Sequence, residues 1–134
     1  MAVSFTGLWS YRSLINSPDL SVTFNDLRFG AGTLDLNEPD PGKIGGSLGG
    51  VGWSLALDGT ATEGNPPIFR WQGRGMIGGE AWVYDYLGYL VPDWPDGVGQ
   101  TDTIVGSVIR TVPHSNGQAT AGYTASFYAV RASG

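Results

Sequence analysis

The sequence predicts an all-β fold, an eight-stranded antiparallel up-and-down β-barrel, and three observations lead to it. Glycine supplies 22 of the 134 residues, well above its ordinary share of about 7%. Only 14% of the residues are charged, against an average of about 25%. Apolar and polar residues alternate over short stretches, and no stretch repeats with the ~3.6-residue period of an amphipathic helix. Because glycine also destabilises helix interiors, this composition favours short, bent strands.

Eight alternating segments are separated by clusters of Pro, Gly, Asn and Asp, which supply the backbone angles that reverse a chain. Residues 15–25 have no such pattern, and a loop, a short helical turn and a lid all fit them. The eight strands are expected near Ser4–Leu14, Asp26–Leu36, Lys43–Gly49, Gly52–Thr62, Pro67–Met76, Ala81–Val91, Thr103–Val112 and Tyr123–Ala132.

The first four segments each have a feature of a strand in a small barrel. The second ends in the Pro- and Gly-containing turn at residues 37–42. The third is rich in glycine, which is typical of a strongly curved strand or hairpin. The fourth separates its large apolar residues from Ser54 and Asp58. The first places bulky and small residues together on one face: Phe5, Gly7, Trp9 and Tyr11.

The last four segments follow the same rules. In the fifth, Phe69 and Trp71 share a face opposite Gln72. The sixth, residues 81–91, is apolar on both faces, so we expect one face to line the interior and the other to meet a partner chain or a helix. The seventh follows the turn at residues 92–97. The eighth alternates bulky and small residues on one face, which fills a tapering barrel: Tyr123, Ala125, Phe127, Ala129 and Arg131.

Strands of this kind can form either a closed barrel or a two-sheet sandwich. The connections between them are short, and closure removes the exposed sheet edges, so we expect the barrel. Residues 1–134 are predicted to form one domain, because a chain of this length buries one core but not two.

Composition argues against several classes of function. The net charge is −5 and only seven Lys and Arg residues are present, too few for the basic face that nucleic acids or anionic membranes require. No apolar run approaches the ~20 residues of a membrane helix, and no signal peptide is visible, so a cytoplasmic location is the default expectation. The absence of cysteine and the single histidine exclude thiol chemistry and sites with several histidines. We expect neither a metal nor a cofactor.

The best functional candidate is the aromatic run from Trp82 to Tyr89. Tyr and Trp present large apolar faces with a polar group, as in pockets for flat ligands, although they also favour strands and fit a plain barrel wall. An inward-facing Asp85 would need a partner for its charge, and Arg110 on the next strand is one candidate; a solvent-facing Asp85 is the alternative. We predict a ligand site at the barrel mouth formed by Tyr11, Trp71, Tyr84, Asp85, Tyr86, Trp94 and Arg110.

Other polar groups carry less information. The acidic residues near Trp94 lie in a Pro- and Gly-containing turn, and their spacing does not match a calcium-binding loop. We expect Trp94, at the tip of this turn, to fold back over the mouth or to meet another subunit. His114 lies in a predicted turn and is expected to be solvated. No ordered Ser–His–Asp pattern is present, so no catalytic residue is predicted.

Gly7-Leu8-Trp9 on the first strand, together with Arg131 near the end of the last, resembles the opening motif of the calycins, the superfamily of lipocalins and avidins. In calycins the arginine packs over the tryptophan and seals one end of the barrel through a cation–π contact. Trp71-Gln72-Gly73 followed by Gly78-Gly79-Glu80-Ala81 is similar to a strand pair of streptavidin-type avidins. Avidins hold biotin through an acid that residues 107–108, Ser-Val, do not supply. The resemblance therefore implies a barrel with a ligand at its mouth, not biotin binding.

Two functions fit these observations. The first is a non-enzymatic barrel that binds a small apolar or aromatic molecule, or a partner chain, at its mouth; a second copy of this chain is a candidate partner. The alternative is a small cyclase or isomerase, similar in outline to allene oxide cyclase barrels, in which Asp85, Arg110 and the tyrosines supply acid, base and electrostatic groups. The lack of a recognisable catalytic set favours binding. A structural subunit without a ligand stays open. In the binding hypothesis the interior is filled by Trp9, Trp53, Phe69 and Phe127.

Overall fold

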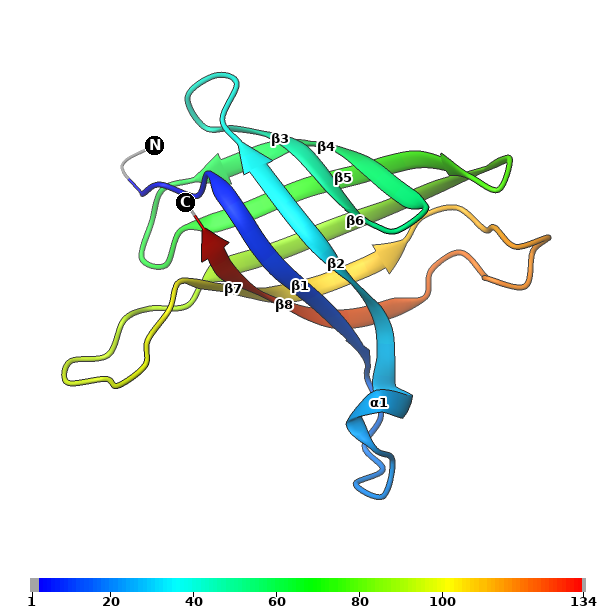
Figure 1. Cartoon of the computed structure of the whole chain (residues 1–134), viewed down its shortest axis with the longest axis horizontal. Helices are drawn as coiled ribbons and strands as arrows, with labels where there is room; N and C mark the ends of the chain where they lie inside the picture. The colour runs from blue at the N-terminus through cyan, green and yellow to red at the C-terminus, as the bar shows by residue number, and fades with distance from the viewer. Residues whose placement is uncertain (1–2, 134) are drawn as a thin grey trace.

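The protein is an eight-stranded antiparallel β-barrel in which each strand pairs with the next and β1 pairs with β8 to close the sheet (Figure 1). A computed structural model describes residues 3–133. This up-and-down topology confirms the predicted fold class, and every predicted strand is present. The strands are β1 (Gly7–Ile15), β2 (Arg28–Asn37), β3 (Lys43–Gly50), β4 (Trp53–Thr62), β5 (Ile68–Ile77), β6 (Glu80–Leu90), β7 (Thr103–Arg110) and β8 (Thr124–Ser133).

The up-and-down order sends alternate connections to opposite ends of the barrel. The chain termini lie at one end with the β2–β3, β4–β5 and β6–β7 connections, and the other four connections lie at the opposite end (Figure 1). Two of those four have only two residues, and in the one between β5 and β6, Gly78-Gly79, both residues have positive φ (59° and 81°). Glycine adopts this backbone conformation without steric cost, so the sequence fixes the β5–β6 register at that turn.

The strong curvature of the sheet requires glycine where neighbouring strands approach most closely. A Cβ added at Gly106 on β7 would overlap the carbonyl oxygen of Leu87 on β6. The Phe127 ring lies over Gly88 on the inner face, with its Cζ 3.1 Å from the position a Cβ would occupy. Part of the space that inward-facing glycines leave is therefore filled by aromatic side chains.

Residues 16–27 form an arm between β1 and β2 that extends away from the barrel (Figure 1). The arm contains α1 (Phe24–Leu27), a single turn. Its N-cap is Thr23, whose side-chain oxygen accepts a hydrogen bond from the backbone N–H of Asp26. Of the three forms that the sequence left open for this segment, a short helical turn is therefore present, and its Phe24 is 81% exposed. Within the described residues α1 is the one helix, and it is far too short to cross a membrane. It does not cover the outer face of β6, so the helix proposed to cover that face is absent, whereas the partner chain stays a prediction.

One end of the barrel is filled by aromatic side chains. Residues before β1 leave the sheet and fold across this end, so that Phe5 is buried and contacts Phe69 edge-to-face at 5.7 Å between ring centres. The predicted start of the first strand at Ser4 is therefore wrong: β1 begins at Gly7, and the preceding residues form a plug. Trp9 is 0% exposed, and its Nε1 donates a 3.0 Å hydrogen bond to the carbonyl oxygen of Phe5. We refer to this as the closed end.

Arg131 completes the closed end. Its guanidinium carbon lies 4.4 Å from the centre of the Trp9 indole, which confirms the predicted packing of this arginine over the tryptophan. The same guanidinium donates hydrogen bonds to the carbonyl oxygens of Ser4 and Thr6 and forms a 3.0 Å ion pair with Asp102. The arginine therefore holds the plug onto the barrel.

Candidate functional site

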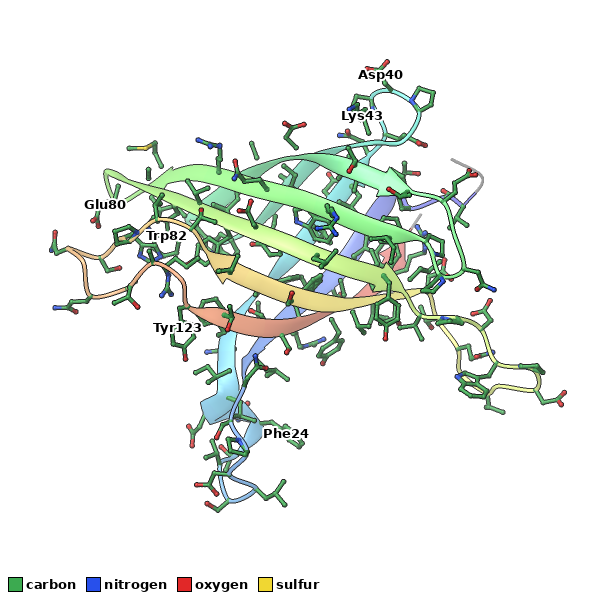
Figure 2. The ribbon with its side chains drawn as sticks, turned by 180° about the vertical axis from the view of Figure 1, so that it is seen from behind. Phe24, Asp40, Lys43, Glu80, Trp82 and Tyr123 are labelled. Carbon is green, nitrogen blue, oxygen red and sulfur yellow. The ribbon has the colours of Figure 1, made fainter. Side chains whose placement is uncertain are left out.

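A cavity of about 390 Å³ lies at the other end of the barrel, which we call the open end. Its wall is formed by residues of β1 to β7, and six of its fourteen lining residues are aromatic. Trp82 and Tyr123 lie at this end, with the arm and Phe24 beside it and Asp40 and Lys43 toward the opposite end (Figure 2). The main aromatic residues of the wall are Tyr11, Phe29, Trp53, Trp82, Tyr84 and Tyr86.

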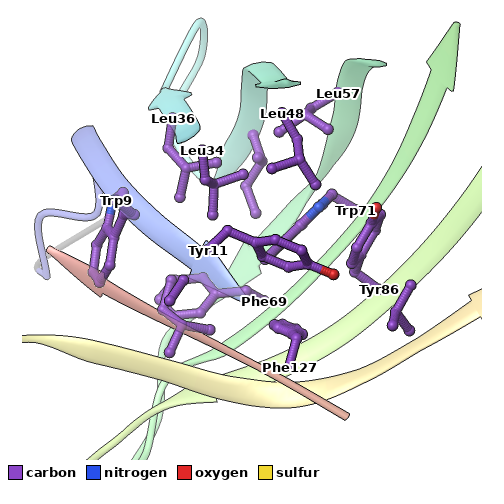
Figure 3. Packing of buried hydrophobic residues seen from close by; sticks show 14 of the residues in the cluster. Trp9, Tyr11, Leu34, Leu36, Leu48, Leu57, Phe69, Trp71, Tyr86 and Phe127 are labelled. Atoms are coloured by element: carbon purple, nitrogen blue, oxygen red, sulfur yellow. The ribbon is translucent and has the colours of Figure 1, made fainter. Parts of the chain in front are cut away.

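The floor of the cavity is a packed aromatic cluster in the middle of the barrel (Figure 3). The rings of Tyr11 and Tyr86 meet edge-to-face at 6.1 Å, and Trp71 stacks on Tyr86 at 5.2 Å. Phe127 contacts all three of these residues. Such contacts favour particular ring orientations, so each ring of the floor is packed against others of the cluster.

The floor also holds hydroxyl groups that stay neutral. Burial raises the pKa of Tyr11 to about 12, opposed by hydrogen bonds with Ser13 and Tyr86. Burial raises the pKa of Tyr86 well above its usual value of 10.0, and the nearby Tyr11 and Tyr84 hydroxyls add to the increase. Ser13 is 1% exposed, and its Oγ lies 3.4 Å from the carbonyl oxygen of Gly30. These groups can donate or accept hydrogen bonds without placing a charge in the cavity.

A polar cluster at the rim joins two strands, β6 and β7, and the loop that follows β7. The Tyr84 hydroxyl accepts a 3.0 Å hydrogen bond from Nε of Arg110 and lies 2.8 Å from Nε2 of His114. The imidazole of His114 stacks on the indole of Trp82 with ring centres 3.7 Å apart. Its Nδ1 lies 2.9 Å from the Ser115 hydroxyl. The tautomer of His114 decides which partner donates in each contact.

His114 is buried, with 4% of its surface exposed, so the expectation of a solvated histidine is wrong. Burial lowers the pKa of His114, the positive charge of Arg110 lowers it further, and Glu80 acts in the opposite direction. The ring is therefore neutral at pH 7. The Glu80 carboxylate fixes the loop by accepting hydrogen bonds from the backbone N–H groups of Ser115 and Asn116, at 3.0 and 3.1 Å.

The structure brings most of the predicted site residues together at this end. Tyr11, Tyr84 and Tyr86 line the cavity, Trp71 packs behind Tyr86, and Arg110 lies at the rim. Trp53, which was expected to fill the interior, is half-buried and forms part of the cavity wall instead.

Two of the predicted residues lie elsewhere. Asp85 is on the outer face, where its carboxylate accepts a 2.9 Å hydrogen bond from the Gln72 amide, so Arg110 is not its partner. The reason is the two-residue period of the strand: with Tyr84 and Tyr86 inside, the residue between them points outward. Trp94 lies in the β6–β7 connection at the closed end and is 74% exposed.

The sequence-based set omitted several residues of this end, among them Ser13, Phe29, Trp53, Trp82 and His114. Strand parity could have identified Ser13, which follows Tyr11 on the same face, and Trp82, which precedes Tyr84. Phe29 and His114 have no comparable signal, because they depend on how the connections at this end fold.

Two further observations bear on chemistry. Among residues 3–133 no three His, Asp or Glu side chains gather as a metal site would require. The outer face of β6 leaves Leu87 39% and Tyr89 41% exposed beside Ile68 of β5. Apart from Asp85, this outer face is therefore apolar, and the inner face carries aromatic rings, as the sequence indicates.

No protein-family model, curated protein or solved structure matches this chain. The barrel class rests on the strand topology alone.

Proposed function

We propose that the barrel binds a small, largely apolar or aromatic molecule in the open-end cavity. The observation that carries this proposal is the cavity itself, about 390 Å³, with a lining of aromatic and aliphatic side chains. Small-molecule sites have volumes of about 300–1,000 Å³ and similar linings. At the closed end, by contrast, Phe5, Trp9 and Phe69 fill the space.

The chemistry of the lining supports a flat ligand with few polar atoms. The rings of Tyr86 and Trp71 are buried and stacked on each other, and side chains already ordered by packing lose little entropy on binding. The hydroxyls of Tyr11 and Ser13 supply a few neutral hydrogen-bonding groups at the floor. No carboxylate or ammonium group lies in the cavity lining.

Placement among calycin-like barrels is part of this proposal. It is supported by the cation–π contact of Arg131 with Trp9, which seals the end of the barrel opposite the cavity. In the matching region of the avidin pattern this chain has Val108 in the cavity wall, an apolar residue, so biotin is not the expected ligand.

The first test is a titration with phenylnaphthylamine, a neutral aromatic probe whose fluorescence rises in apolar sites. We expect saturable binding to the wild-type protein. Ile77→Trp adds bulk at the cavity wall and should weaken binding by about tenfold or more, since the ring needs the space that an indole would occupy. Met76→Trp is the matched control, because Met76 is the preceding residue and is 70% exposed.

Two results would contradict binding in this cavity. One is the absence of any saturable response in the wild-type protein. The other is equal weakening by Ile77→Trp and Met76→Trp, which would place the probe on the outer surface.

A second function, a barrel cyclase or isomerase, is favoured by one observation. The Tyr84 hydroxyl contacts both a neutral imidazole and a guanidinium, an arrangement suited to proton transfer at the rim of the cavity. Native mass spectrometry of protein purified from its own host would identify a bound molecule. Recovery of that molecule chemically altered after incubation, with the alteration abolished in Tyr84→Phe, would establish catalysis; recovery unchanged would leave binding alone.

A further inference from the structure

We infer that the open-end cavity selects ligands that carry one anionic group, which Arg110 binds at the rim. The inference rests on the proposed function and adds the charge of the ligand to it. The expected ligand class is an aromatic or otherwise apolar acid, with its body in the cavity and its carboxylate, sulfonate or similar group at the mouth.

The position of Arg110 is the first argument. Arg110 is the last residue of β7 and pairs with Tyr84 across the sheet. Its guanidinium carbon lies 5.3 Å from the ring centre of Phe29, 5.6 Å from that of Tyr84 and 5.5 Å from that of Tyr123. Phe29 and Tyr84 also line the cavity, so a molecule that fills the cavity lies beside the guanidinium.

The orientation of the guanidinium is fixed by its surroundings. The rings of Phe29 and Tyr123 stack on each other 5.4 Å apart and nearly parallel, at 5°. Nε of Arg110 donates to the Tyr84 hydroxyl at 3.0 Å, and Nη1 donates to the carbonyl oxygen of Thr120 at 3.2 Å. A preorganised guanidinium loses little entropy when it binds an anion, and its planar fork suits bidentate recognition.

The charge of Arg110 has no counter-ion in the described part of the chain. Both of its hydrogen-bond acceptors are neutral oxygens, and no carboxylate lies within ion-pair distance. The contrast with Arg131 is direct, because that arginine has Asp102 as an ion-pair partner and two backbone carbonyls as acceptors. Two half-buried arginines in one barrel thus differ in whether their charge is compensated.

Neighbouring titratable groups leave this positive charge in place. Glu80 is the acid at this rim, and its two carboxylate oxygens accept from the Ser115 and Asn116 N–H groups. His114 is neutral, so it adds no charge of either sign. In a chain of net charge −5, the mouth of the cavity therefore offers an anion the Arg110 cation and neutral hydroxyls, while the Glu80 carboxylate is bound to backbone N–H groups of the loop.

The experiment compares two probes that share one ring system. Anilinonaphthalene sulfonate carries a sulfonate that phenylnaphthylamine lacks. We expect Arg110→Gln to weaken the sulfonate probe by about tenfold and to change the neutral probe by less than about twofold. Arg12→Gln is the matched control, because Arg12 lies over the Tyr128 ring at 5.9 Å on the outer face and should leave both affinities unchanged.

A wild-type measurement keeps the inference testable if Arg110→Gln unfolds. Raising the salt concentration from about 0.02 M to about 0.5 M should weaken the sulfonate probe several-fold and leave the neutral probe unaffected, since ions screen an exposed charge pair. Binding of the neutral probe without charge selectivity would overturn this inference and leave the proposed function standing. Failure of both probes to bind would overturn both.

Discussion

The two ends of the barrel are built from similar aromatic residues and differ in what covers them. At the closed end Trp9 is fully buried, Phe5 packs across it, and Arg131 lies on the indole. At the open end Trp53 is half-buried and its ring borders an empty volume. The difference comes from the chain segment before β1, which plugs one end, whereas the arm between β1 and β2 extends away from the other.

The hydrogen bonding of the two ends differs in the same sense. At the closed end the Arg131 guanidinium donates to two backbone carbonyls and to Asp102. Its hydrogen bonds and its charge therefore serve the structure of that end. At the open end Arg110 contacts a phenol and one carbonyl, and its charge is not compensated. Polar groups that a fold does not need for itself are the ones available to a ligand.

The largest expected effect breaks the closed end. Trp9→Ala removes a fully buried indole and its hydrogen bond to Phe5, and should lower the free energy of unfolding by about 3–5 kcal/mol. Trp53→Ala, the matched substitution at the open end, should cost less than half as much because that side chain is only half-buried. Urea unfolding followed by circular dichroism measures both. Equal losses would show that the two ends are equally packed and that the cavity is closed in solution.

Strand parity explains how far the sequence could predict this architecture. Alternation identified all eight strands and the inward faces of β1, β5 and β8. It also marked Phe5 as inward-facing, but alternation reports burial and not pairing, so the sequence could not show that the chain leaves the ladder before Gly7. The same rule would have excluded Asp85, since two flanking tyrosines cannot both face inward beside an inward aspartate.

The up-and-down topology also determines the end of the barrel at which each connection lies. Connections alternate between the two ends, so the loop that holds Trp94 lies on the side of the termini and cannot border a mouth formed by Tyr84 and Arg110. The burial of His114 could not be predicted in this way. Glu80 accepts a hydrogen bond from the N–H of Ser115, 35 residues further along the chain, and so ties the β7–β8 loop to β6. Loops have no period, and such long-range hydrogen bonds leave no local pattern.

A second prediction concerns the tyrosines of the cavity floor at high pH. Burial raises the pKa of Tyr11 to about 12, while an unfolded chain releases this proton near its usual value of 10.0. The stability contributed by the buried hydroxyl is therefore complete below about pH 10 and is lost as the pH rises toward about 12. Tyrosinate absorbance should show that two of the six tyrosines, Tyr11 and Tyr86, ionise only as the protein unfolds.

Tyr11→Phe is the control for the alkaline transition, because it removes one of the two groups and should flatten the dependence of stability on pH. Ionisation of all six tyrosines in the folded protein near about pH 10 would mean that the floor is open to water. The cavity would then reach deeper than the aromatic cluster, and the division between the two ends would be less sharp.

The smallest effect tests the rim through the single histidine, which gives one unambiguous imidazole signal in a nuclear magnetic resonance titration. Burial and the charge of Arg110 lower the pKa of His114 in the folded protein. In the unfolded chain the imidazole takes up a proton at about pH 6.5, while in the folded protein it does so only at a lower pH. Stability should therefore be complete above about pH 6.5 and fall as the pH drops toward the folded pKa. Arg110→Gln should raise that pKa, because it removes the nearby positive charge.

A folded pKa at the usual value, unmoved by Arg110→Gln, would mean that His114 is in water. The rim would then be mobile, and the open end would lack the fixed arginine on which charge selectivity depends.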